Sequence, residues 1–265
     1  MSKALKITVL AASALLLVGI TLWTVGGIRS GSFFPLRKGS ETVEQREKQF
    51  DEAIKRVQIE EVSAEVELYP AEDGVCRVVY SETEREKLEL SVKDGTLSLK
   101  RKSGSNWGFF SFGSLGQEFG PTKLYLPEAV YEKIDIEAVS GDVSLERGIS
   151  AARLNVKTVS GEIAVPEMEA EQISTYSVSG DQRVNHATAG ELSCESTSGN
   201  ITLDACDAQK IKLETVSGDV NAKLLSEKEI TTSTASGDVS VPNNRQGASP
   251  CQVETVSGDI RVETP

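Results

Sequence analysis

Apolar and polar positions alternate along the C-terminal half of the chain, and the alternation itself recurs about every 19 residues. Within each of seven segments, an apolar position is followed two and four residues later by apolar or small residues, with polar residues between them. Period-two alternation predicts a β-strand with one face toward a core. The first apolar column holds Ile134, Leu154, Ile173, Leu192, Ile211, Ile230 and Cys251.

Each segment ends in a Ser-Gly pair followed by Asp, Glu or Asn. Successive serines are 20, 19, 19, 19, 19 and 21 residues apart. A near-constant period of this size predicts a solenoid, in which each unit buries its apolar face only against its neighbours. The repeat corners are Ser140, Gly141, Asp142, Ser160, Gly161, Glu162, Ser179, Gly180, Asp181, Ser198, Gly199, Asn200, Ser217, Gly218, Asp219, Ser236, Gly237, Asp238, Ser257, Gly258 and Asp259.

The spacing of inward positions predicts a bend at each Ser-Gly pair. From Thr158 to Ile163 is an odd step, which an unbroken strand cannot make while both side chains face inward. Glycine fits a corner that needs a positive φ or a close approach to the next rung. We therefore predict an all-β fold, a single-stranded β-solenoid with rungs of about 19 residues whose handedness the periodicity does not determine.

The N-terminus predicts a membrane anchor. Lys3 and Lys6 precede an uncharged stretch over residues 7–28, which as a helix would span about 33 Å, enough for a bilayer core. A cleaved signal peptide is the alternative, but a short apolar core and a small-x-small cleavage site are not evident. A lipoprotein-type anchor is excluded because no cysteine precedes Cys76.

The orientation of this single-pass anchor rests on a weak charge bias. Arg29, Arg37 and Lys38 beyond the apolar stretch offset the lysines before it. Long domains that follow a first span are translocated largely regardless of such charges. We expect the protein at the cell membrane, with residues 1–28 as cytoplasmic N-terminus and anchor and the solenoid outside the cytoplasm.

Residues 29–54 predict a juxtamembrane linker that ends in a short amphipathic helix. Thr42 could cap this helix, and Val43, Phe50 and Ile54 are its apolar positions. We expect it to cover the first rung, because an open solenoid end exposes unpaired strand groups.

The solenoid domain is expected to occupy residues 55–265. A degenerate copy of the repeat stands at 62–66, and further strand candidates lie at 75–80, 88–92 and 96–100. At about 19 residues per rung, the domain would hold roughly eleven rungs.

The pattern fails between residues 103 and 121, where aromatic residues stand among Gly and Ser. Such a loop could present rings to sugars, to a lipid interface or to a protein. The alternative is that it folds over the solenoid to shield apolar surface. The candidate interaction residues are Trp107, Phe109, Phe110, Phe112 and Phe119.

Two columns at the corners leave alternatives open. The acidic row after each Gly could bind Ca²⁺ between neighbouring rungs. Alternatively, its carboxylates could accept hydrogen bonds from backbone N–H groups at the corners. We favour the second interpretation, because Asn200 interrupts the row. The column before each Ser is mostly Val, as at Val139 and Val159. If it points outward it forms an apolar stripe, and if it points inward it is core.

Composition excludes several classes of function. A formal net charge of −12 argues against nucleic acid and against docking of the solenoid to anionic lipid headgroups. The four cysteines match no zinc spacing and are expected to be buried thiols. With one histidine, His186, and no catalytic set, we predict no enzyme, no cofactor and no metal; a glycan-active lyase or hydrolase-like solenoid is the alternative.

The anchor, the Asp-Gly-Thr-Leu-Ser-Leu segment at 94–99, the Leu-Tyr-Leu-Pro segment at 124–127 and the tandem Val-Ser-Gly-Asp-Val units together resemble a known group. The chain is similar to the bacterial putative-adhesin family of β-strand repeat proteins, a domain of unknown function that includes LiaG-like membrane proteins. The resemblance implies a right-handed β-helix-like fold outside the membrane and a link to envelope-stress signalling.

We therefore expect an extracytoplasmic binding, adhesion or scaffold module of the cell envelope. Its expected partners are a protein or a cell-wall glycan. Self-association through the C-terminal solenoid end is a further hypothesis, because no capping helix follows the last repeat before Pro265.

Overall fold

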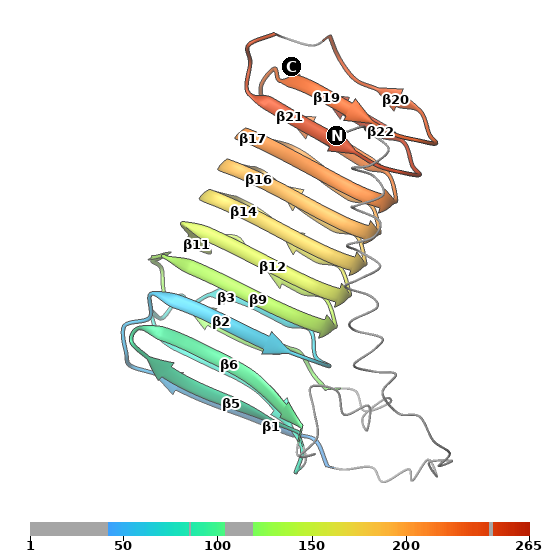
Figure 1. Ribbon diagram of the computed structural model, residues 1–265. Coiled ribbons are helices and arrows are strands. Elements are labelled where there is room, and N and C mark those ends of the chain that lie inside the picture. The colour runs from blue at the N-terminus through green and yellow to red at the C-terminus, as the bar shows by residue number, and fades with distance from the viewer. Residues whose placement is uncertain (1–41, 85, 104–118, 244–245) are drawn as a thin grey trace, which may run out of the picture.

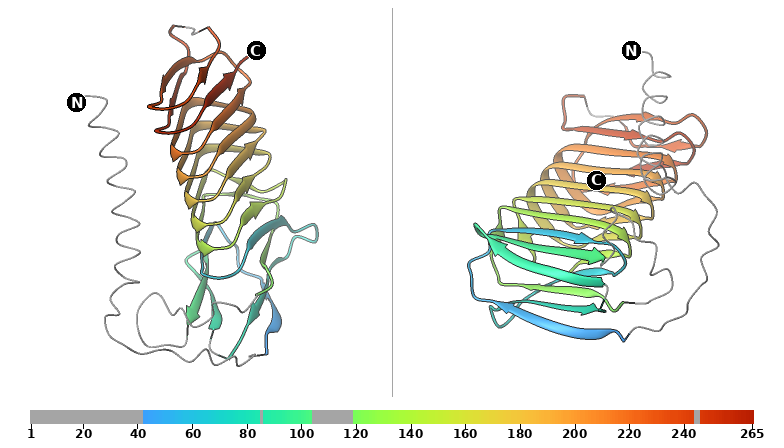
Figure 2. Two further views of the ribbon diagram at one scale, coloured as in Figure 1. Left: turned by 90° about the vertical axis from the view of Figure 1, so that its right-hand side faces the viewer. Right: turned by 60° about the horizontal axis from the view of Figure 1, so that its bottom comes forward.

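The protein is a two-faced β-solenoid in the computed structural model, which describes residues 42–84, 86–103, 119–243 and 246–265. Strands of successive rungs stack side by side along one axis, with the N-terminal strands at one end and the C-terminal strands at the other (Figures 1 and 2). The described residues contain strands, turns and bends, and no helix. The predicted all-β solenoid is confirmed.

Face 1 consists of the strands that enter the corners. They run parallel to one another, except for the antiparallel end strand β5. In stacking order they are β5 (Glu86–Lys93), β6 (Thr96–Ser103), β2 (Arg56–Glu61), β9 (Lys133–Ser140), β12 (Arg153–Ser160), β14 (Met168–Ser179), β16 (Ala187–Ser198), β17 (Ile201–Ser217), β21 (Pro250–Glu254) and β19 (Glu229–Ser233).

Face 2 consists of the strands that leave the corners, with antiparallel strands added at its N-terminal end. Strand β17 is long enough to begin on this face and continue onto face 1. In stacking order the strands are β1 (Glu44–Phe50), β4 (Cys76–Glu82), β7 (Thr122–Leu126), β3 (Val66–Pro70), β10 (Val143–Leu145), β13 (Ile163–Val165), β15 (Gln182–Asn185), β17, β18 (Val220–Leu224), β22 (Ile260–Glu263) and β20 (Val239–Ser240). The short strands β8 (Val130–Tyr131) and β11 (Ser150–Ala151) pair in a return.

The core lies between the two faces, where the inward columns of the repeat stack. On face 1, Leu154 pairs in register with Ile134 and with Ile173, and all three are almost fully buried. On face 2, Val143 pairs with Ile163, also buried. The period-two pattern therefore identified the inward positions correctly, because each apolar side chain lies over its equivalent in the next rung.

The predicted bend lies at the Ser-Gly corners. Gly180 has φ of +151°, and a Cβ built there would lie 2.0 Å from the carbonyl oxygen of Gly161 in the next rung. Only a residue without a side chain allows the two backbones to approach so closely. In the degenerate copy, Ala64 stands at this position, at the N-terminal end of the glycine column, and lies under Gly141.

The predicted helix at 42–55 is wrong: residues 44–50 form strand β1, which pairs antiparallel with β4. Only Phe50 of this strand is buried. Its polar residues lie along the free edge of β4, whose unpaired N–H and C=O groups favour another strand over a helix. The solenoid end is thus covered by antiparallel strands.

The expectation of about eleven rungs is also wrong. Among the described residues, nine strands run parallel on face 1: β6, β2, β9, β12, β14, β16, β17, β21 and β19. The segments at 75–80 and 88–92 are strands, as predicted, but they form the antiparallel end strands β4 and β5.

The rungs do not stack in chain order at either end. Strand β2 lies between β6 and β9, although β6 follows it in sequence. At the other end, the last repeat, β21 and β22, lies between β17–β18 and β19–β20 (Figure 1). The C-terminal edge in space is therefore β19 and β20. The hypothesis of self-association at this end stays a prediction and concerns these strands.

The predicted anchor at 7–28 lies outside the described residues. Within the part of the chain that the structure describes, no helix is long and apolar enough to cross a membrane.

Candidate functional site

The acidic row at the corners forms hydrogen bonds between rungs. The Asp142 carboxylate accepts the backbone N–H of Glu162 at 2.7 Å, and the Asp219 carboxylate accepts that of Asp259 at 2.8 Å. Asn200 accepts the N–H of Asp219 through its side-chain oxygen in the same way. The row therefore supplies acceptors for backbone N–H groups at the bend, as the favoured interpretation predicted. Both carboxylate oxygens and the amide oxygen of Asn200 act as acceptors.

The valine column before each serine points outward. Val139, Val159, Val178, Val216 and Val256 are half-buried, whereas the neighbouring corner serines are exposed. Val62 in the degenerate copy is 39% exposed. These side chains form a narrow apolar stripe along the corner edge. Of the two alternatives left open by the sequence, an outward stripe or a part of the core, the structure shows the stripe.

The predicted aromatic loop lies mostly outside the described residues, including Trp107, Phe109, Phe110 and Phe112. Phe119 is described and half-buried, and its ring lies 5.0 Å from the guanidinium carbon of Arg101. The loop joins β6 on face 1 to β7 on face 2, and so replaces the Ser-Gly corner of that rung.

A buried ion pair lies at the base of this loop. Arg101 donates from Nε to Glu61 Oε1 at 2.8 Å and from Nη2 to Glu61 Oε2 at 3.0 Å. It also donates to the Ser81 carbonyl at 2.7 Å, and the Thr122 hydroxyl donates to Glu61. Because a buried charge is tolerated only when it is paired and hydrogen-bonded, this network holds β2 and β6 in fixed register.

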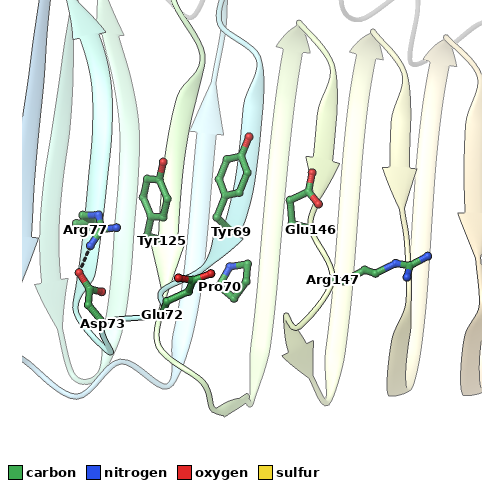
Figure 3. Close-up of a pocket in the computed structure, with 8 residues that line it drawn as sticks. All are labelled: Tyr69, Pro70, Glu72, Asp73, Arg77, Tyr125, Glu146 and Arg147. Carbon is green, nitrogen blue, oxygen red and sulfur yellow. Dashed lines mark hydrogen bonds and ion pairs between the residues drawn. The ribbon is translucent and has the colours of Figure 1, made fainter.

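An aromatic pair that the sequence did not identify as a site lies on the outward surface of face 2. The Tyr69 and Tyr125 rings stack, with centroids 5.2 Å apart and planes inclined by 20°. The Arg77 guanidinium carbon lies 4.4 Å from the centre of the Tyr125 ring. Figure 3 shows the two rings side by side on neighbouring strands, with Arg77 beyond Tyr125 and Glu146 beyond Tyr69. We call Tyr69, Tyr125 and Arg77 the tyrosine platform.

The fold places the platform through alternation and register. Tyr125 stands between the buried residues Leu124 and Leu126, so its ring points outward. Tyr69 pairs directly with Tyr125 across β3 and β7. From the alternation alone, each tyrosine could have been predicted to point outward. Their contact could not be predicted, because the two strands lie more than fifty residues apart in the sequence and no local pattern shows that they pair.

Charged groups fix and surround the platform. Tyr69 donates a hydrogen bond of 2.8 Å to Glu67, and this bond raises the pKa of the phenol. Glu67 also lies 3.0 Å from Lys123 and raises the pKa of its ammonium group. On the other side, Asp73 pairs with Arg77; the N–H of Val75 and this guanidinium lower the pKa of the Asp73 carboxyl.

Two larger hollows open on face 2, besides one of about 260 Å³ near the corners that is lined mostly by acidic side chains. The first, of about 520 Å³, is bounded by the platform together with Glu72, Glu146 and neighbouring residues. The second, of about 620 Å³, lies toward the C-terminal end and is lined by polar residues that include Asn185, Asp204 and Lys223. The side chains that line the two larger hollows include carboxylates, which accept hydrogen bonds, and Lys and Arg groups, which donate them.

The cysteines are buried thiols, as predicted. Cys76, Cys194, Cys206 and Cys251 are all free and buried. Burial raises the pKa of Cys194 and of Cys251 to about 12, and that of Cys76 to about 11. No group of three or more His, Cys, Asp or Glu that could hold a metal ion occurs among the described residues. His186 is exposed in a return with φ of +53°.

The fold and its repeated corners define a solenoid of the β-strand repeat class. The family model described as Toastrack DUF4097 matches residues 54–265. The chain therefore belongs to the Toastrack DUF4097 family, which agrees with the resemblance seen in the sequence.

Three solved structures are similar to this chain at low identity. A putative adhesin from Bacteroides fragilis is 17% identical, with 85% of this chain and 98% of that chain covered and a TM-score of 0.54. A putative adhesin from Parabacteroides distasonis is 13% identical over 84% of this chain and 98% of its own, with a TM-score of 0.46. A second Parabacteroides distasonis protein, a putative lipid binding protein, is 14% identical over 86% of this chain and 98% of its own, also with a TM-score of 0.46. None of the curated proteins compared matches the chain.

Proposed function

We propose that this protein is a membrane-anchored binding module of the bacterial cell envelope that binds glycan through the tyrosine platform. The stacked pair of Tyr69 and Tyr125, half-exposed and surrounded by charged groups, carries the proposal. Because Tyr69 and Arg77 cover the Tyr125 ring, the ring edges and the Tyr69 face turned away from Tyr125 offer the apolar surface to the C–H side of a sugar. Neighbouring carboxylates and guanidinium groups form hydrogen bonds with its hydroxyls.

A binding role is also consistent with the likeness to the Bacteroides fragilis protein, which is described as a putative adhesin. The proposal is for binding rather than catalysis. We also infer that the rungs wind in the right-handed sense, which parallel β crossovers adopt in almost all known sheets.

The anchor and the location belong to the same proposal. The uncharged stretch at 7–28 would hold the solenoid at the outer surface of the cell membrane, where envelope glycan is within reach. Protease added to spheroplasts is expected to degrade the solenoid of the full-length chain; protection until the membrane is lysed would contradict the proposed orientation.

The aromatic loop is proposed as an additional contact. Phe119 packs against Arg101, so a loop variant should keep it and replace only residues 104–118 with a Gly/Ser linker. Loss of partners in a crosslinking pulldown, with an unchanged circular dichroism spectrum, would assign recognition to the loop. Unchanged partners would leave recognition to the solenoid faces.

The test of the platform is cosedimentation of the full-length chain, in detergent micelles, with purified cell-wall sacculi from which bound anionic polymers have been removed. We expect wild type to sediment with the sacculi and Tyr125→Ala to remain largely in the supernatant. Tyr176→Ala is the matched control, because Tyr176 is a half-buried tyrosine that points outward from face 1. Equal binding by wild type and the Tyr125→Ala variant would contradict the proposed site.

A further inference from the structure

The two larger hollows of face 2 lie along one row of outward side chains. Tyr125 pairs in register with Tyr69, and Glu146 donates its backbone N–H to the Leu68 carbonyl, next to Tyr69. Farther along, Asn185 pairs in register with Asp204. Lys223 Nζ lies 3.7 Å from Asp204 Oδ1 on the following strand. We call Tyr125, Tyr69, Glu146, Asn185, Asp204 and Lys223 the face 2 row.

The row crosses seven neighbouring strands, with one of its six residues on or directly after each of them except β13, and the register of β17 with β18 shifts at Asp204. It runs across β7, β3, β10, β13, β15, β17 and β18. Neighbouring strands are ~4.8 Å apart, so the row is about 29 Å long. An extended β-linked polysaccharide advances by a comparable distance per sugar ring, so that successive rungs can meet successive sugars.

The charges along the row favour an uncharged ligand. Glu146 and Asp204 are acceptors, Lys223 is a donor, and Asn185 offers both kinds of group. No single sign of charge dominates, and the net charge of −12 for the whole chain repels polyanions. The Asp204 and Lys223 side chains are 49% and 65% exposed. Their ion pair is therefore weak, and both groups can exchange it for sugar hydroxyls.

We propose that the ligand is a linear, uncharged, β-linked polysaccharide that lies across the strands of face 2, from the tyrosine platform to Lys223. The inference rests on the proposed function, because the platform holds one end of the ligand. It adds that recognition extends over the length of the solenoid, so that affinity depends on chain length.

The test is calorimetric titration of the full-length chain, in detergent micelles, with chito-oligosaccharides from the disaccharide to the octasaccharide. We expect affinity to keep rising beyond the tetrasaccharide. Lys223→Ala should weaken octasaccharide binding roughly threefold to tenfold, the effect of one lost hydrogen bond at an exposed site, and leave the disaccharide unaffected. Tyr125→Ala should weaken binding at every length. Lys157→Ala, an exposed lysine in an ion pair on face 1, is the matched control.

An affinity that stops rising at the disaccharide, together with an unchanged octasaccharide affinity in Lys223→Ala, would overturn the extended site. The proposed function would survive that result, since binding would then be confined to the platform. Failure of the wild type to bind any of these oligosaccharides would also overturn the inference, and cosedimentation with sacculi would separately decide whether the proposed function fails with it.

Discussion

At the scale of single residues, the corner glycine allows the rungs to stack. A Cβ at position 180 would meet the Gly161 carbonyl oxygen at 2.0 Å, and φ is +151° there. We predict that Gly180→Ala lowers the free energy of unfolding by about 2–5 kcal/mol, from overpacking and backbone strain together. Urea denaturation followed by circular dichroism measures the loss.

The neighbouring serine provides the control for this prediction. Ser179 is exposed at the same corner, and surface substitutions away from special features usually change stability by no more than about 0.5 kcal/mol. Ser179→Ala should therefore resemble wild type. A Gly180→Ala variant as stable as Ser179→Ala would show that the close backbone approach is not required.

The acidic row leads to a second prediction, since its residues act as acceptors. Asp219 accepts the N–H of Asp259, and an asparagine oxygen can do the same, as Asn200 does for Asp219. We expect Asp219→Asn to leave the melting temperature and the free energy of unfolding nearly unchanged. Asp219→Ala should lower the free energy of unfolding by about 1 kcal/mol. If Asn were as damaging as Ala, the charge itself would be the stabilising feature.

The buried thiols predict a loss of stability at alkaline pH. Burial raises the pKa of Cys194 and of Cys251 from 9.0 to about 12, so the folded protein holds these protons more tightly than the unfolded chain. Their contribution is complete below about pH 9 and falls as the pH rises from 9 toward 12. A Cys194→Ala, Cys251→Ala variant should show a shallower decline in urea midpoint across this range, and an identical decline would contradict the assignment.

At the scale of elements, the strands of the repeats could be predicted from sequence, because their inward columns recur with a constant period. The helix at 42–55 could not be distinguished from a strand: Val43, Phe50 and Ile54 fit a helical face, but the open edge of β4 decided the outcome. The stacking order β6, β2, β9 could not be predicted from the sequence either, because the alternation of apolar residues does not specify which strands pair. The Glu61–Arg101 pair that fixes the first of these registers joins residues forty positions apart.

The same limit applies to the candidate site. The corners and their acceptor row follow from the repeat and could be placed in advance. The tyrosine platform lies in the irregular N-terminal rungs, where Tyr69 and Tyr125 become neighbours only through the pairing of β3 with β7.

The unusual order of the last elements gives a fourth prediction. The corner of the final repeat bridges both neighbours, with Ser257 opposite Ser217 on one side and Ser236 on the other. Adjacent strands place two Cα atoms within disulfide range, whereas two rungs apart they are beyond about 7 Å. Ser217→Cys with Ser257→Cys should therefore crosslink on oxidation. Ser217→Cys with Ser236→Cys should not, and crosslinking of that pair instead would mean that the repeats stack in chain order.

At the scale of the whole molecule, the solenoid offers two long faces of different character. Face 1 carries ladders of paired charges, such as Lys157 with Glu137 and Lys210 with Glu191. Face 2 carries the tyrosine platform and the two larger hollows, of about 520 and 620 Å³, whereas a hollow on face 1 is about 190 Å³. The rigid stacking of rungs keeps the outward side chains of each face in line, so a ligand longer than one rung can contact several of them at once.

The central claim is that face 2 is the binding surface, and thiol footprinting tests it most directly. Glu146→Cys introduces a thiol beside the platform, and Glu137→Cys introduces one on face 1; both glutamates are exposed. The native cysteines are buried with raised pKa values, so they add little background labelling. We predict that sacculi slow the alkylation of Glu146→Cys and leave that of Glu137→Cys unchanged. Protection of Glu137→Cys alone, or of neither thiol while the protein is bound, would contradict the claim.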